Sequence, residues 1–169
     1  MNRTDTLAYQ AAFRGFAETD SWHAPHAVTL TMKQGRQVDG GKGASIQSLT
    51  PDEASANLRH FLNRLNQHVY GNAAQRYGKA VPVIPVVEGG NGKRLHYHLV
   101  IDCPRDDLRE GYVDLLTELW GQTDWGHKKV HVEADCDAGW TKYVSKLRDK
   151  PNFADSIDWA NYHPCDRRD

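Results

Sequence analysis

The sequence predicts an α+β domain whose elements follow the ferredoxin-like order βαββαβ around a central antiparallel sheet, with an extra helix at the end. Three observations predict this fold: four segments that alternate apolar and polar residues, two longer segments with helical periodicity, and a Gly-rich turn between the second and third strands. A chain of 169 residues can bury one core. We therefore expect one domain over residues 1–150 and a polar tail over residues 151–169.

The first predicted strand covers residues 27–33, where apolar side chains alternate with Thr29 and Thr31. The two threonines should therefore point away from the core. Residues 34–48 are polar and rich in glycine, so we expect a long mobile loop. This loop does not match a nucleotide-binding loop, because Gly43 stands where that motif needs Ser or Thr.

A helix should begin after Thr50, which is a preferred N-cap residue. Pro51 suits the first helical position, and Glu53 completes a capping box with Thr50. The helix should end before Gly71. Its apolar stripe consists of Leu58, Phe61, Leu62, Leu65 and Val69.

The second and third predicted strands, residues 81–88 and 94–102, form a hairpin. Pro82 and Pro85 cannot donate hydrogen bonds to a neighbouring strand, so the second strand should lie at an edge of the sheet. In the ferredoxin-like topology the third strand is then central.

The third strand carries two histidines on one face. Alternation directs His96 and His98 away from the helices. A five-residue loop, residues 89–93, would pair Glu88 with Arg94 and place the carboxylate on the histidine face. The other register would direct Glu88 into apolar packing, which is costly. The residues expected to face the helices are Leu95, Tyr97, Leu99 and Ile101.

The second crossover helix should cover residues 105–120, the last strand residues 128–134, and the extra helix residues 138–148. The two crossover helices would cover one face of the sheet and leave the other open. The second helix should present Leu108, Tyr112, Leu115 and Leu119 to the sheet, and the last strand should turn Lys129, His131 and Glu133 to the open face.

Two imidazoles and one carboxylate with open coordination positions suit a divalent catalytic cation. We therefore predict that Glu88, His96 and His98 bind Mn²⁺ or Mg²⁺. The alternative is that the histidines are ordinary cross-strand partners.

Tyr143 and Lys146 lie three residues apart in the extra helix and so share one helical face. A phenol has a pKa of about 10 and is a poor nucleophile unless a neighbouring charge or a metal-activated electrophile assists it. Lys146 can supply that charge. The alternative is that Tyr143 is a half-buried residue with its hydroxyl in water.

These motifs and their order resemble the HUH endonucleases, specifically the single-tyrosine initiators (Rep proteins) of rolling-circle replication. AVTLTMK at residues 27–33, HYH at residues 96–98 and YVSK at residues 143–146 are similar to the family's three motifs in order. Glu88 stands where the family often supplies its remaining metal ligand. The resemblance covers about residues 27–148.

The resemblance implies sequence-specific nicking and joining of single-stranded DNA at a replication origin. Tyr143 would form a covalent 5′-phosphotyrosine, the metal would polarise the scissile phosphate, and Lys146 would stabilise the phenolate or orient the phosphate. Many family members continue into a helicase domain, which this chain is too short to contain. The resemblance therefore implies a helicase supplied in trans or by a missing region.

Net charge is −1, which is unusual for a nucleic-acid-binding domain, but Lys and Arg cluster locally. The residues predicted to contact DNA are Thr29, Thr31, Lys93, Arg94, Lys129 and Lys142.

Three other functions fit the same pattern. A non-catalytic single-stranded nucleic-acid-binding module would have this topology but bind without metal. A transposase or relaxase of the HUH superfamily would share the motifs, although the relaxase tyrosine usually precedes the histidines. A metal-dependent hydrolase would leave Tyr143 without a role.

The chain contains no apolar stretch of membrane-spanning length and no apolar signal core, so we expect a cytoplasmic protein without a membrane partner. Cys103, Cys136 and Cys165 are odd in number and lack CxxC spacing, which predicts reduced thiols.

Overall fold

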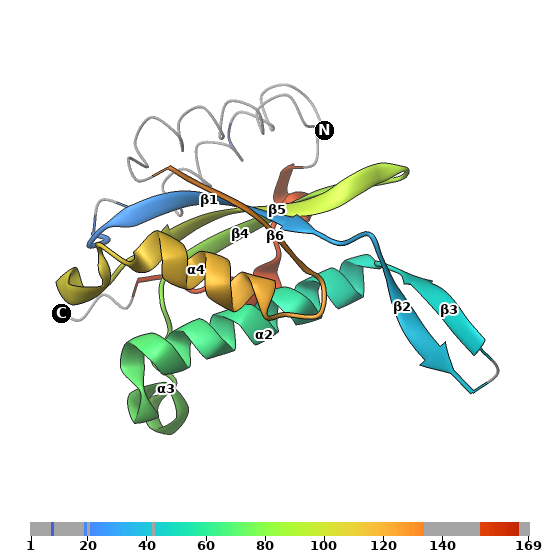
Figure 1. Cartoon of the computed structure of the whole chain (residues 1–169). Helices are drawn as coiled ribbons and strands as arrows, with labels where there is room; N and C mark the ends of the chain where they lie inside the picture. Colours follow the sequence, from blue (N-terminus) through green and yellow to red (C-terminus); the bar gives the residue numbers. More distant parts are fainter. Residues whose placement is uncertain (1–7, 9–18, 20, 42, 134–152, 166–169) are drawn as a thin grey trace.

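A computed structural model describes residues 8, 19, 21–41, 43–133 and 153–165 of the chain. Its centre is a four-stranded antiparallel sheet in the order β4-β5-β1-β6 (Figure 1). This is the ferredoxin-like strand order, so the predicted fold class is confirmed, and β4 with its prolines lies at an edge as expected. The strands are β1 (Pro25–Met32), β4 (Val83–Gly90), β5 (Lys93–Asp102) and β6 (Gly126–Glu133).

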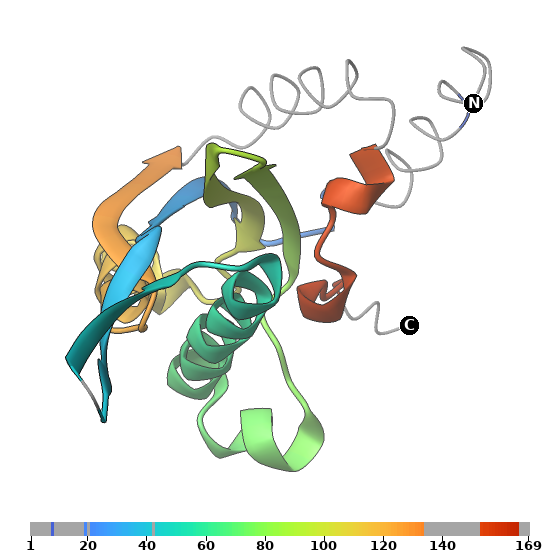
Figure 2. The same ribbon diagram turned by 90° about the vertical axis from the view of Figure 1, so that its right-hand side faces the viewer.

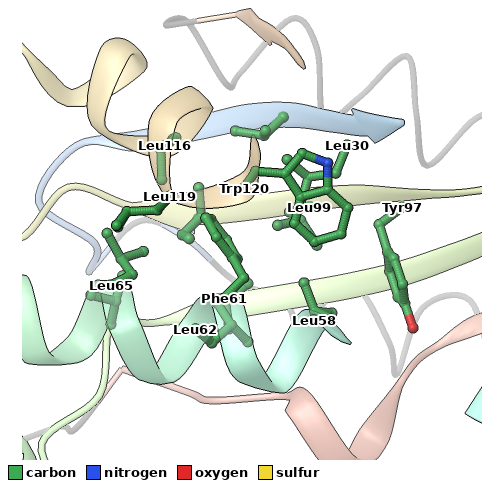
Figure 3. Packing of buried hydrophobic residues seen from close by; sticks show 14 of the residues in the cluster. Leu30, Leu58, Phe61, Leu62, Leu65, Tyr97, Leu99, Leu116, Leu119 and Trp120 are labelled. Atoms are coloured by element: carbon green, nitrogen blue, oxygen red, sulfur yellow. The ribbon is translucent and has the colours of Figure 1, made fainter. Parts of the chain in front are cut away.

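Two helices, α2 (Pro51–Tyr70) and α4 (Tyr112–Gly121), cover one face of this sheet (Figures 1 and 3). The predicted start of α2 is confirmed, because Thr50 and Glu53 form the reciprocal capping box. Between helices and sheet lies the main core, in which Phe61 and Trp120 meet edge to face with ring centroids 5.6 Å apart. The predicted stripe of α2 is fully buried in this core.

The second crossover segment differs from the prediction of one helix over residues 105–120. A short 3₁₀ turn, Asp106–Leu108, precedes α4, which begins only after Gly111. The helical phase assumed across the whole segment therefore does not apply to α4. Its buried residues are Tyr112, Leu116, Leu119 and Trp120, whereas Leu108 and Leu115 are only partly buried. A short helix that was not predicted, α3 (Asn72–Tyr77), follows α2.

The prediction of a mobile loop over residues 34–48 is wrong. This segment forms an antiparallel ribbon of β2 (Gly35–Gly40) and β3 (Gly43–Ser48), which projects from the sheet (Figures 1 and 2). The glycines that suggested a loop lie mainly at the turn, where a hairpin needs them. At its root, Arg36 pairs with Asp124 at 2.9 Å and lies over the Trp125 ring.

The second face of the sheet is only half open, in contrast to the prediction. Ile84, Val86 and Val100 form a small apolar cluster there, covered by Trp22 and Ile157. These three strand residues have the same alternation parity as the histidines, so an apolar half and a polar half share this face. Apolar residues at outward positions needed a cover that the sequence pattern did not identify.

That cover comes partly from the segment 153–165, which the sequence analysis left without a role. It runs along β4, with the backbone N–H of Val83 donating to the carbonyl of His163 at 2.8 Å and a return bond of 3.0 Å (Figure 2). Asp158 adds a bond from its backbone N–H to the carbonyl of Pro85. The otherwise free edge of β4 is therefore paired.

Candidate metal centre

Strand β5 holds His96 and His98 at the centre of the polar half of the face. On one side β1 pairs Thr29 with His98 and Thr31 with His96, and on the other β4 pairs Glu88 with His96. Directly paired residues of antiparallel strands point to the same face. The predicted histidine face, with Glu88 on it, is therefore confirmed.

The predicted pairing of Glu88 with Arg94 is wrong by two residues. The loop is a two-residue turn, Asn91–Gly92, with positive φ angles of 50° and 88°, and Gly90 pairs with Lys93. An uninterrupted ladder from this turn would pair Glu88 with Leu95 and direct the carboxylate into the core.

A β-bulge prevents this outcome. The register shifts between Glu88 and Gly90, so that Gly89 alone faces both Arg94 and Leu95. A shift of one residue turns every following side chain to the other face of the sheet. The bulge therefore places Glu88 beside His96 and His98.

The three side chains converge on one point. Nε2 of His96 lies 3.1 Å from Nε2 of His98, and these nitrogens are 3.4 Å and 3.3 Å from Oε2 of Glu88. The side chains of Glu88, His98 and His96 are 20%, 23% and 30% exposed, so the point is reachable from solvent. Among the described residues, this is the one group with the composition and spacing of a metal site.

The spacing fits a divalent cation. Ligand atoms about 2.1 Å from a metal, at angles between octahedral and tetrahedral, lie about 3.0–3.4 Å from one another. The three distances between Glu88, His96 and His98 fall in this range. Three ligands also leave positions for water or substrate, as a catalytic site requires.

The other ring nitrogen of each histidine has a partner. Nδ1 of His96 is 3.0 Å from the carbonyl oxygen of Arg94, and Nδ1 of His98 is 3.1 Å from Oγ1 of Thr29. Because a carbonyl oxygen only accepts, Nδ1 of His96 carries the proton. Its Nε2 therefore offers a lone pair to the centre when the ring is neutral.

Gln34 supports the backbone between the ligands and the bulge. Its side-chain oxygen accepts from the N–H of Leu95 at 2.8 Å, and its amide donates to the carbonyl of Leu95 at 3.0 Å. These bonds take the place of strand pairing where β1 leaves β5. Sequence reasoning missed both this contact and that of Thr29, since each depends on the register between β1 and β5.

The residues predicted to contact DNA lie around this centre. Lys93 and Arg94 are exposed at the start of β5, and Lys129 is exposed on β6. Thr31 donates its hydroxyl hydrogen to the carbonyl of Lys129, and the Thr29 hydroxyl contacts His98. The contacts of these residues with DNA stay predictions.

The remaining predicted residues are placed as follows. His131 lies on the centre's face, paired with Thr29, but it is largely exposed and its Nε2 lies 3.4 Å from Glu133 rather than near the three ligands. The extra helix with Lys142, Tyr143 and Lys146 lies outside the described residues.

Comparison with known proteins gives one match. The sequence profile of the replication-associated protein ORF2 family matches residues 25–151, which is most of the chain. Neither curated proteins nor solved structures gave a match. In the part of the chain that the structure describes, no helix has the length and apolar character needed to cross a membrane.

Proposed function

The chain belongs to the replication-associated protein ORF2 family, and from this premise we propose that it is an HUH-type endonuclease that nicks and rejoins single-stranded DNA at a replication origin. The observation that carries the proposal is the convergence of Glu88, His96 and His98 on one solvent-accessible point. A family of replication proteins acts on DNA, and this donor set suits phosphodiester chemistry.

In the proposed reaction, Glu88, His96 and His98 hold a divalent cation, Mn²⁺ or Mg²⁺, which when bound would polarise the scissile phosphate. The phenolic oxygen of Tyr143 attacks the phosphorus in line, and the bond from phosphorus to the 3′ oxygen breaks. The leaving oxygen takes a proton and becomes a free 3′-hydroxyl, while the 5′-phosphate stays on Tyr143. Lys146 stabilises the phenolate. Attack by a 3′-hydroxyl reverses the step and joins the strand.

The DNA would lie across the polar half of the sheet face. Lys93, Arg94 and Lys129 flank the centre there and offer contacts to phosphates, despite the overall charge of −1. Double-stranded origins would require a helicase from another protein or from a further region.

The experiment that tests the proposal uses single-stranded oligonucleotides from the protein's own replicon, labelled at either end. They are incubated with the wild-type protein in Mn²⁺ or in EDTA and run on a denaturing protein gel. A Tyr143→Phe variant is the test, and Tyr77→Phe, at a 76% exposed tyrosine on α3, is the matched control.

We expect a Mn²⁺-dependent covalent adduct that carries only the fragment 3′ to the nick. It should be absent in EDTA and in Tyr143→Phe, and unchanged in Tyr77→Phe. Cleavage without an adduct would support a hydrolase instead, and metal-independent binding without cleavage would support a non-catalytic binding module. An adduct on transposon ends but not on origin sequences would support an HUH transposase.

A further inference from the structure

We propose that Thr29 is a positioning residue for the metal centre. Its hydroxyl would hold Nδ1 of His98 so that Nε2 presents its lone pair to the cation shared with Glu88 and His96. This inference rests on the metal site of the proposed function and assigns to Thr29 a task other than the predicted contact with DNA.

The geometry supports this task. Thr29 pairs directly with His98 across β1 and β5, and Oγ1 of Thr29 lies 3.1 Å from Nδ1 of His98. Strand β1 is paired on both sides, with β5 and with β6, so the backbone at Thr29 is held firmly. A β-branched side chain also has few rotamers, which keeps the hydroxyl in place.

The chemistry of imidazole explains why this contact matters. A neutral histidine that binds a metal through Nε2 keeps its proton on Nδ1, and an acceptor at that proton fixes the tautomer and the ring orientation. For His96 the acceptor is the backbone carbonyl of Arg94. For His98 the oxygen at this position belongs to the side chain of Thr29, so a substitution can remove it.

The same strand supplies a matched control. Thr31 also has its side chain on the histidine face, where it pairs with His96, but its hydroxyl donates to the carbonyl of Lys129 and does not contact a ligand. Replacing either threonine by valine removes one hydroxyl and keeps the shape. Only the change at Thr29 removes a partner of a histidine ring.

The test measures Mn²⁺ binding to the full-length protein by calorimetry, without DNA, for wild type, Thr29→Val, Thr29→Ser and Thr31→Val. Loss of an oxygen that orients a metal-bound histidine weakens metal affinity by about 10- to 100-fold, and we expect this for Thr29→Val. Thr29→Ser should restore binding to within a few fold, and Thr31→Val should bind like wild type. Thermal melts of each variant without metal check the fold.

Equal affinity of Thr29→Val and wild type would overturn the inference, and so would equal loss in the serine variant, because the hydroxyl would then not be responsible. If Thr29→Val does not fold, Thr29→Ser and Thr29→Ala replace it, since they differ by a single hydroxyl. Absence of Mn²⁺ binding in the wild type would instead overturn the metal centre and with it the proposed function.

Discussion

At the scale of single residues, Gly89 determines which face Glu88 occupies. Its φ angle is +104°, which residues with a side chain rarely adopt. A Cβ atom at this position would lie 2.2 Å from the carbonyl oxygen of Arg94. That carbonyl accepts the hydrogen bond from His96, so the bulge and the orientation of one ligand depend on the same close backbone contact.

We therefore expect Gly89→Ala to lower the free energy of unfolding by about 1–3 kcal/mol, because the backbone must take up strain. It should also weaken Mn²⁺ binding, since the carbonyl of Arg94 must move. Urea unfolding and calorimetry measure the two effects. Gly41→Ala, where an added Cβ would meet nothing within 4 Å, should change the unfolding free energy by less than about 0.5 kcal/mol. Similar results for the two variants would contradict the role of Gly89.

At the scale of elements, the sequence predicted those features that depend on local patterns. Alternation identified the strands and faces of His96 and His98, and the capping residues identified the start of α2. Features that depend on pairing between distant segments were not predictable in this way. The register of Glu88 depends on a bulge, and the cover over Val86 and Val100 comes from the segment 153–165.

This C-terminal segment is fastened to the central residue of the His96–His98 motif. The hydroxyl of Tyr97 points out of the core (Figure 3) and donates to Asp158 at 2.9 Å. Asp158 also accepts from the side-chain amide of Asn161 at 2.7 Å, and that amide donates in turn to Ser55 on α2. One carboxylate thus links β5 and the C-terminal segment, and Asn161 extends the link to α2.

Asp158→Ala should therefore loosen the segment. It leaves the Tyr97 hydroxyl and the Asn161 amide without their acceptor, a loss of about 1–3 kcal/mol. Hydrogen exchange should become faster at the N–H groups of Val83 and His163, which bond to each other's carbonyls. Asp155→Ala, at an exposed aspartate in the same segment, is the control. Unchanged exchange at these two amides in Asp158→Ala would show that the carboxylate does not hold the segment.

At the scale of the whole molecule, the sheet separates structural support from chemistry. One face packs on α2 and α4, and the other is divided into an apolar half under Trp22 and Ile157 and a polar half with the metal centre. The core side of this arrangement contains two tyrosines that are held in their protonated form. Burial, assisted by the charge of Asp158, raises the pKa of Tyr97, and burial raises the pKa of Tyr112 well above its usual 10.0.

Protein stability should therefore fall at alkaline pH. Above about pH 10 the tyrosines of the unfolded chain lose their protons, whereas Tyr97 and Tyr112 keep theirs in the folded state, so ionisation favours unfolding. The free energy of unfolding should fall by up to about 1.4 kcal/mol per pH unit for each of the two tyrosines. Urea unfolding at about pH 9 and pH 11 measures this slope. Tyr112→Phe should make it shallower, and an unchanged slope would contradict the role of this phenol.

The central claim is that the metal centre directs DNA to Tyr143, and mass spectrometry of the covalent adduct tests it most directly. After reaction with an origin oligonucleotide in Mn²⁺, nuclease trimming and trypsin cleavage, the peptide YVSK of residues 143–146 can be released after Lys142. We predict that this peptide carries a 5′-linked nucleotide on Tyr143, and that His98→Ala abolishes the modified peptide. A nucleotide on any other residue, or an adduct that forms equally well in His98→Ala, would contradict the account.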